Sequence, residues 1–551
     1  MADPQSSAIR NVCVVGHHGA GKTALVEALL AASGAIPRLG SCEKGTTVCD
    51  FEPEEIQRHL SVSMSIAPFE LDGVKVNLLD VPGYADFSSE MSMAFALCDL
   101  ALVVVSASDG VQAQTQDAWR AAAGGGLPRI IVVNKLDRER ADFHRALEEI
   151  RASFGAGVAP VELPIGEESA FCGVVDLLDD TATTYAPSEG PPWKASVGVV
   201  PDALAIEEKA VREQLVEGIV VSDDDLMTRY LDGEALQRLE LQGALGAGIA
   251  SAAVFPVVCT SAITGVGIDR LAKVLVELTP PAVSRAALGE AGEETSEIAC
   301  DPAGPPMLVV CKTLSDQHAG KLSLCKVVSG TVHPDTTLVN TRSRGEERLH
   351  VLELLRGQRT SPLTEVVAGD FVAVPRLSAT RTGDTLGPKG SRTTIRLPEP
   401  DPPSLEAAVK PMTRADEDKL MTSLQRLSEE DPSISVNRVD ETHQTVVSTA
   451  GEIHLAITLE RLARKFGVHV EREDLVVAYR ETISHGAEAE GRYKKQTGGH
   501  GQFGVVHLKV EPLERGAGFQ FHDQVVGGAI PRQYIPAGEK GVLEAMEQGG
   551  I

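Results

Sequence analysis

The sequence predicts an α/β multidomain protein, in which a domain built on a mostly parallel sheet is followed by a β-barrel and α+β domains. Three observations favour this class. The chain has 551 residues, which is more than one hydrophobic core usually serves. Its first half alternates continuously apolar, β-rich runs with helical stretches, as parallel sheets covered on both faces require. After residue 305, short strands broken by Gly, Asp and Asn turns dominate.

The domain boundaries follow from changes in these patterns. The segment between Asn134 and Cys259 is too long for a single crossover connection, so an inserted subdomain is expected there. Acidic or Pro-rich stretches mark the later joints. The predicted parts are a first domain at 1–283 with the insertion at about 158–250, a linker at 284–306, a β-barrel at 305–396, an α+β domain at 403–478 and a last part at 479–551.

Composition limits the class of protein only weakly. The net charge of −27 argues against nonspecific nucleic-acid binding, although local basic patches could still dock on RNA. No run of 18 apolar residues predicts a membrane span, and the N-terminus lacks the pattern of a signal peptide. Nine scattered cysteines without a CxxC pair indicate buried thiols in a reducing compartment. A cytoplasmic, monomeric protein without a membrane partner is therefore expected.

The most informative motif lies between the apolar run NVCVV and the helical run TALVEALLAAS. It reads GHHGAGKT and satisfies the pattern GxxxxGK[ST] of a phosphate-binding loop. Backbone N–H groups of such a loop wrap the phosphates, the lysine bridges the β- and γ-phosphates, and the hydroxyl binds Mg²⁺. The two histidines are expected mainly to shape the loop. The predicted nucleotide-binding residues are Gly16, His17, His18, Gly19, Ala20, Gly21, Lys22 and Thr23.

A second motif, DVPGY, follows the strand-like run VKVNLL. Asp80 stands where a carboxylate directed at Mg²⁺ belongs, and Gly83 can offer its backbone N–H to a γ-phosphate. Such a DxxG pattern is weak alone but specific downstream of a phosphate-binding loop. The candidates here are Asp80, Val81, Pro82, Gly83 and Tyr84, with Lys22, Gly83 and Tyr84 as the catalytic candidates.

Two further strand ends predict the base. In the motif NKLD, Asp137 can accept hydrogen bonds from N1–H and the exocyclic amine of guanine, whereas adenine would leave the carboxylate unpaired. Asn134 can tie the base to the loop, the stem of Lys135 can cover its face, and Leu136 completes the motif before Asp137. Ser261 and Ala262 end another strand, where a backbone group can meet the guanine oxygen. Together the motifs predict binding of GTP and GDP with Mg²⁺.

Beyond the motifs, nearly the whole chain resembles elongation factor G and its G-like branch among the translational GTPases. The segments that carry the resemblance are GTTVCDF, LPIGEESAFCGVVDLL, GKLSLCKVVSGTV, GEIHL, KKQTGGHGQFG and GGAIPRQYIPAGEKG. The resemblance implies a P-loop GTPase domain, a barrel and α/β domains, the last one incomplete here. It also implies the ribosome as the partner, two nucleotide-sensing segments, switch I (45–63) and switch II (80–90), and Ser61 as a further Mg²⁺ ligand beside Thr23 and Asp80.

The chain departs from the family pattern at three places. Tyr84 replaces the histidine that positions the attacking water; a phenol is protonated at neutral pH and is no base, but it can orient water. In switch I, His59 replaces a glycine and Ser61 a threonine, which keeps a hydroxyl for Mg²⁺. Gly19 replaces the aspartate of ordinary elongation factor G, as in the G-like branch.

The last part of the chain contains clustered cations within an acidic protein. By the resemblance, candidate contacts to ribosomal RNA are Arg492, Lys494, Lys495 and Arg532.

The leading hypothesis is an elongation factor G-like GTPase that acts in translocation or in ribosome release and recycling. One alternative is a guanine-nucleotide-dependent ribosome binder, a regulator or protection protein, with little hydrolysis. An ATP-dependent P-loop enzyme is a third, which Asp137 disfavours.

Overall fold

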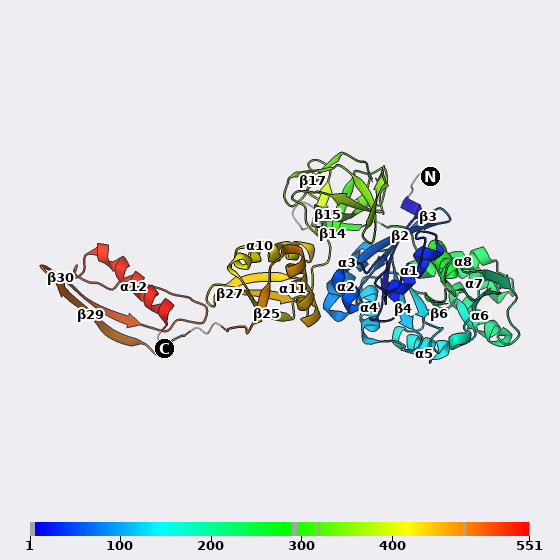
Figure 1. Ribbon diagram of the computed structural model, residues 1–551, viewed down its shortest axis with the longest axis horizontal. Coiled ribbons are helices and arrows are strands. Elements are labelled where there is room, and N and C mark those ends of the chain that lie inside the picture. The colour runs from blue at the N-terminus through cyan, green and yellow to red at the C-terminus, as the bar shows by residue number, and fades with distance from the viewer. Residues whose placement is uncertain are drawn as a thin grey trace. The chain divides into compact units, whose positions relative to one another are not determined.

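A computed structural model of the protein (Figure 1) describes residues 6–188, 190–221, 223–234, 236–283, 285–288, 295–316, 320–477 and 481–549. These form two compact units. The second unit comprises residues 439–443 and everything described after 475, and the first unit contains the rest.

A seven-stranded sheet forms the centre of the N-terminal region, in the order β2-β3-β1-β4-β5-β11-β6. All neighbouring strands are parallel except β2 and β3. The central strands are buried along their whole length, which explains why their sequences are apolar without alternation. The strands are β1 (Ile9–Val15), β2 (Ser65–Leu71), β3 (Val74–Asp80), β4 (Leu100–Ser106), β5 (Arg129–Asn134), β6 (Val158–Pro160) and β11 (Phe255–Cys259).

Helices lie between these strands, as crossovers between parallel strands require, and one further helix follows the last strand, β11. They are α1 (Lys22–Ala32), α2 (Pro53–Arg58), α3 (Ser88–Leu97), α4 (Ala113–Gly124), α5 (Phe143–Phe154) and α9 (Ile268–Leu278), with short 3-10 turns at Ser6–Ala8 and Ala85–Phe87. Trp119 of α4 stacks on Phe154 and meets Phe255 edge-on, so this helix packs on the sheet.

Between β6 and β11 the chain builds a separate antiparallel sheet, in the order β10-β9-β8-β7, and three helices. The sheet contains β7 (Glu162–Ile165), β8 (Gly173–Asp176), β9 (Thr181–Tyr185) and β10 (Ala195–Gly198), with a 3-10 turn at Glu168–Ala170; the helices are α6 (Ala205–Val220), α7 (Asp224–Leu231) and α8 (Arg238–Ala250). We call this segment the inserted subdomain.

The region after residue 305 is an eight-stranded antiparallel sheet, β18-β17-β23-β14-β15-β22-β19-β20, with a small β16-β21 pair. Its strands are β14 (Met307–Asp316), β15 (Gly320–Ser329), β16 (Thr331–Val332), β17 (Thr336–Asn340), β18 (Glu346–Leu349), β19 (Leu352–Arg356), β20 (Arg359–Leu363), β21 (Val366–Val367), β22 (Phe371–Pro375) and β23 (Thr385–Gly387). We call it the β domain.

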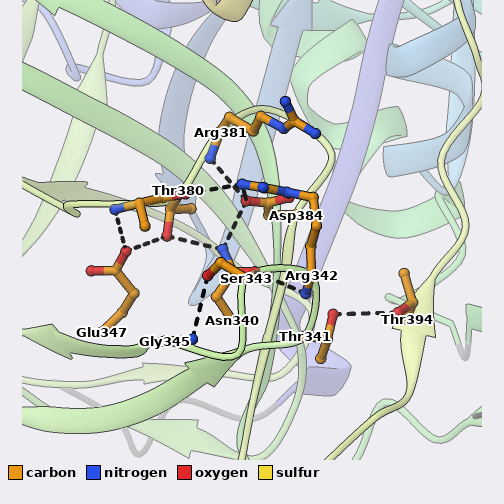
Figure 2. Close-up of polar contacts among 11 residues, drawn as sticks. Asn340, Thr341, Arg342, Ser343, Gly345, Glu347, Thr380, Arg381, Asp384 and Thr394 are labelled. Atoms are coloured by element: carbon orange, nitrogen blue, oxygen red, sulfur yellow. Dashed lines mark hydrogen bonds and ion pairs between the residues drawn. The ribbon is translucent and has the colours of Figure 1, made fainter. Parts of the chain in front are cut away.

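Polar side chains hold two loops of the β domain together (Figure 2). Asp384 accepts hydrogen bonds from Asn340 Nδ2 at 2.7 Å and from Arg342 Nε at 2.6 Å. Glu347 accepts from Thr380 Oγ1 at 2.8 Å and from the backbone N–H of Ala379 at 2.8 Å. Because both carboxylates are buried, these bonds satisfy charges that would otherwise be costly.

The predicted linker at 284–306 is partly wrong. Its described residues include β12 (Arg285–Leu288) and β13 (Thr295–Ile298), which form an antiparallel sheet with β24 (Thr394–Ile395). The acidic, Ala- and Gly-rich composition indicated a linker, but pairing with a strand from about a hundred residues downstream satisfies the backbone.

An α+β fold follows, with the sheet order β26-β27-β25-β28. Its elements are β25 (Leu405–Pro411), α10 (Arg414–Glu430), β26 (Ser435–Val439), β27 (Gln444–Thr449), α11 (Glu452–Phe466) and β28 (Val470–Glu473). The second unit contains the hairpin β29 (Ala487–Thr497)–β30 (His500–Val510), a 3-10 turn at Arg532–Tyr534 and α12 (Ile535–Gln548). The boundary predicted at 478–479 lies outside the described residues.

The α/β multidomain fold class is confirmed. No helix within the described ranges is both long and apolar enough to cross a membrane.

Candidate functional site: a nucleotide-binding centre

The phosphate-binding loop joins β1 to α1. Gly16, Gly19 and Gly21 have φ angles of 138°, 82° and 93°, which glycine adopts without strain. Lys22 is 6% exposed, and its Nζ donates to the carbonyl oxygens of Gly16 and His17, each at 3.1 Å. The loop therefore holds the lysine ammonium at its centre.

Oxygen atoms from three segments meet beside this loop. Thr23 Oγ1 donates to Asp80 Oδ2 at 2.7 Å and lies 3.2 Å from Ser61 Oγ. The other carboxylate oxygen, Asp80 Oδ1, is buried and has no hydrogen-bond partner among the described residues. Hydroxyl and carboxylate oxygens suit Mg²⁺, and the unpaired oxygen is what a site for a hydrated cation would leave. The residues therefore fit the metal that their sequence predicts.

The charges of the site are buried together. Burial and the neighbouring carboxylate of Asp50 raise the pKa of Asp80. Burial lowers the pKa of Lys22, although Asp80 and Asp50 oppose this change. The Asp80 carboxylate and the Lys22 ammonium are thus both shielded from water. Anionic phosphates would compensate the charge of Lys22, and a divalent cation would compensate that of Asp80. Asp50, whose carboxylate acts on the pKa of both Asp80 and Lys22, belongs to this cluster, and the sequence prediction missed it.

Switch II packs directly on the loop. The Gly83 carbonyl accepts a hydrogen bond from His18 N at 3.0 Å, and a Cβ atom at Gly83 would overlap Lys22 Nζ and Gly16 O. Tyr84 is 37% exposed and meets the His18 ring edge-on, with the ring centroids 6.2 Å apart. Burial and the charge of Lys22 lower the pKa of His18, which favours a neutral imidazole at this position.

The base-recognition motifs meet at the ends of β5 and β11. Asn134 Nδ2 donates to Ala20 O at 3.1 Å, and its Oδ1 accepts from Ala262 N at 3.2 Å. Ser261 Oγ donates to Asp137 Oδ1 at 2.7 Å. Asn134 therefore joins the phosphate-binding loop to the segment after β11, and Ser261 orients the carboxylate predicted to recognise guanine.

His59 lies at the end of helix α2 in switch I. It ends α2 with a φ angle of 50°, the left-handed conformation that the family's glycine adopts freely. Its Nδ1 lies 3.2 Å from Cys42 O, so the end of α2 contacts the segment just before switch I.

Both switches contact helix α11. Arg58 of switch I pairs with Glu460 through bonds of 2.7 and 2.5 Å. The switch II carboxylate of Asp86 accepts from the backbone N–H groups of Ile453 and His454 at 3.1 and 3.2 Å, which caps the N-terminus of α11. An apolar cluster of Leu60, Val62, Phe87 and Ile457, with Ile453 packed against it, joins the same three segments. A conformational change in either switch would therefore alter the contacts that hold α11.

Replacing Arg464 by alanine is expected to loosen switch I. Arg464 Nε donates to Glu54 Oε1 at 2.7 Å, and the Glu54 side chain is only 4% exposed. Its loss would leave a buried carboxylate unpaired, at a cost of about 1–3 kcal/mol. Amide hydrogen exchange over Pro53–Arg58 should accelerate roughly tenfold.

The matched control is Arg472→Ala, which removes an ion pair to Glu452, a side chain that is 66% exposed. Exchange in α2 should not change in this control. Equal amide exchange in α2 of Arg464→Ala and of the wild type would contradict the claim that Arg464 of α11 stabilises switch I.

Asp431 gives α11 a pH-dependent anchor. Burial alone would raise its pKa, but the hydrogen bond and charge of His454, with bonds from Ser433, lower the pKa to about 2. The folded pKa lies below the ordinary value of 3.8, so this stabilisation is complete above pH 3.8 and is lost as the pH falls toward 2. Asp431→Asn is expected to destabilise the α+β fold by about 2 kcal/mol near neutral pH.

Urea unfolding followed through amide exchange in α11 measures this difference. The difference in the free energy of unfolding between Asp431→Asn and the wild type should shrink as the pH falls below 3.8. Glu417→Gln, an exposed change on α10, should unfold with the same free energy as the wild type. A difference in the free energy of unfolding that does not change with pH would show that the charge of Asp431 does not stabilise the fold.

The RNA-contact candidates belong to the second unit. Arg492, Lys494 and Lys495 lie on β29 and are exposed, with Arg492 5.4 Å from the centroid of the Phe503 ring. Arg532 lies in the turn before α12 and is exposed. These placements leave the RNA contacts a prediction.

Comparison with known proteins gives the same class along the whole chain. Family models match for the elongation factor Tu GTP binding domain (residues 7–281), elongation factor G domain 2 (305–388), domain III (400–474) and domain IV (476–551). Fold and site thus define a GTP-binding translational GTPase. More narrowly, the chain belongs to the elongation factor G-like family.

Its relatives include the "Elongation factor G-like protein" of two Mycobacterium tuberculosis strains, CDC 1551 / Oshkosh and ATCC 25618 / H37Rv. Each is 39% identical over 573 residues, covering 98% of this chain and 77% of the relative. A crystal structure of a protein from Thermus thermophilus is 34% identical, with a TM-score of 0.82 over 98% of this chain and 78% of that one.

Proposed function

We propose that this protein binds GTP and GDP with Mg²⁺ and hydrolyses GTP while bound to the ribosome in the cytoplasm. The observation that carries the proposal is the meeting of Lys22, Thr23, Asp80, Asn134 and Asp137 at the carboxyl ends of the central strands, where α/β sheets bind ligands. The family membership of the chain supports the ribosome as its partner.

Each site residue has a role in this proposal. The backbone of the phosphate-binding loop cradles the phosphates, and Lys22 bridges the β- and γ-phosphates. Thr23, Asp80 and Ser61 would hold Mg²⁺, which when bound neutralises charge on the phosphate oxygens. Asp137 accepts guanine N1–H and the exocyclic amine, with Ser261 holding its carboxylate.

In the hydrolytic step, water attacks the γ-phosphorus as the bond to the β–γ bridging oxygen breaks, giving GDP and phosphate. Lys22 stabilises the charge that develops on the bridging oxygen. The Gly83 N–H donates to the γ-phosphate, and the Tyr84 hydroxyl orients the water without taking its proton. Tyr84 is exposed enough to swing toward this position from its edge contact with His18.

The rest of the chain would transmit the nucleotide state. Asp86 and Arg58 connect both switches to α11, so release of the γ-phosphate would change how the α+β fold is held. We further propose that the task is translocation or ribosome release. We also propose a division into domains at 1–283, 305–396, 403–478 and 479–551, and the residue ranges of the matching family models support this division.

A second candidate is a nucleotide-gated ribosome binder with little hydrolysis. Tyr84 favours it, because its hydroxyl makes no hydrogen bond to any described residue and a phenol is not a base at neutral pH.

Single-turnover GTP hydrolysis by the purified chain, with and without ribosomes, tests these functions. Stimulation of the wild type by ribosomes supports the GTPase. Flat turnover in the wild type, with stimulation restored only in Tyr84→His, supports the gated binder. Tyr84→Phe is the matched control, since it keeps the ring and removes only the hydroxyl that orients water.

A further inference from the structure

A tryptophan of the inserted subdomain lies on the turn that follows β11. Trp193 precedes β10, and a Cβ atom at Gly265 would overlap its indole ring at Cδ2, Cε2 and Nε1. Gly265 also has a φ angle of 79°. The turn can therefore take its shape only with glycine at this position, directly against the indole. The indole N–H is buried without a hydrogen-bond partner among the described residues, so the contact is one of packing.

The same turn carries Ser261, which bonds the carboxylate predicted to recognise the base. Gly265 N donates to Ser261 O at 2.9 Å, and Ser261 N donates to Val266 O at 3.0 Å. Ser261 Oγ in turn donates to Asp137 Oδ1. Only one residue, Gly265, and one backbone hydrogen bond thus separate the indole from the residue that orients the guanine-recognising carboxylate.

The inserted subdomain is fixed to the segment just beyond the turn. The hydroxyl of Tyr185 on β9 donates to Asp269, in the first turn of α9. The next residue, Arg270, pairs with Asp176 of β8 and lies 3.8 Å from Glu162 of β7. Three strands of the subdomain therefore contact the start of α9. These contacts fix the subdomain beside the turn, so that the Trp193 side chain packs on the turn in one position.

We propose that Trp193 is a positioning residue for guanine recognition, which holds the 261–267 turn so that Ser261 orients Asp137. The inserted subdomain thereby sets how long guanine nucleotide stays bound. This inference rests on the proposed function, because it assumes that Asp137 and Ser261 receive the base.

The test is the dissociation rate of N-methylanthraniloyl-GDP from the full chain, measured by stopped flow. Trp193→Ala is expected to accelerate dissociation about tenfold, the equivalent of roughly 1.4 kcal/mol. Trp193→Phe should stay close to the wild type, because it keeps an aromatic ring and loses no hydrogen bond. Val199→Ala, at a side chain of the same subdomain that is 88% exposed, is the matched control and should behave as the wild type.

A second readout separates positioning from general destabilisation. IDP lacks the exocyclic amine that Asp137 is expected to accept, so a displaced carboxylate should lower the preference for GDP over IDP in Trp193→Ala. Competition by inorganic tripolyphosphate should not change, because the phosphate-binding loop is untouched.

Wild-type dissociation rates and GDP preference in Trp193→Ala would overturn the inference, and so would equal weakening of GDP, IDP and tripolyphosphate. A wild-type chain that does not bind the labelled GDP would instead refute the proposed function, and this inference with it.

Discussion

Replacing Lys22 by alanine is expected to weaken binding of GTP and GDP at least a hundredfold, roughly 3 kcal/mol for the loss of charged hydrogen bonds to phosphate. The Lys22 ammonium donates hydrogen bonds to two loop carbonyls, and it is almost fully buried. Burial already lowers the pKa of Lys22. Keeping the lysine charged in this site therefore costs desolvation free energy, which hydrogen bonds to phosphate oxygens would offset.

Equilibrium titration with labelled GDP measures this effect. Lys209→Ala, an exposed change on α6, should bind as the wild type does. GTP should be affected more than GDP, because the lysine bridges to the γ-phosphate only in GTP. Unchanged affinity for both nucleotides in Lys22→Ala would mean that the GHHGAGKT loop is not the phosphate site.

Replacing Asp137 by asparagine is expected to change which base the protein accepts. The carboxylate can take two hydrogen bonds from guanine, and losing both charged acceptors should weaken GDP about a hundredfold or more. An amide can instead donate to the 2-oxo group of xanthine, so binding of XDP should appear. In the folded chain Ser261 already fixes one oxygen of this side chain, so the replacement should keep its place.

XDP serves as the internal control for this variant, since bound XDP demonstrates that the protein is folded. Asp117→Asn, at a carboxylate that is 56% exposed on α4, should leave the preference for GDP intact. The assignment of Asp137 would be refuted by an Asp137→Asn variant that still prefers GDP over XDP.

Sequence patterns predicted those parts of the site that are local. A phosphate-binding loop, a DxxG motif and an NKLD motif each lie within a few residues of a strand end, and the parallel sheet brings strand ends to one edge. The buried, non-alternating strands likewise followed from continuous apolar runs such as LALVVVS. Which base and metal contacts these residues make stays a prediction.

The parts that were missed depend on contacts between distant residues. Asp50 lies in the GTTVCDF segment that carries the family resemblance, but that segment does not indicate a role for the carboxylate, and only folding of switch I brings it near Lys22. Asp86 meets the N-terminus of α11, more than 360 positions away, and no periodicity indicates such a cap. Trp193 lies in the polar, Pro- and Gly-rich stretch APSEGPPWKASVG, which carries no motif, and its place on Gly265 depends on the sheet of the inserted subdomain.

The most direct test of the central claim is calorimetric titration of the nucleotide-free chain with GDP and, separately, with ADP, each with Mg²⁺ and with the metal chelated. We expect one GDP site per chain, weaker binding after chelation, and no measurable ADP binding, because adenine leaves Asp137 unpaired. ADP that binds as tightly as GDP would contradict it.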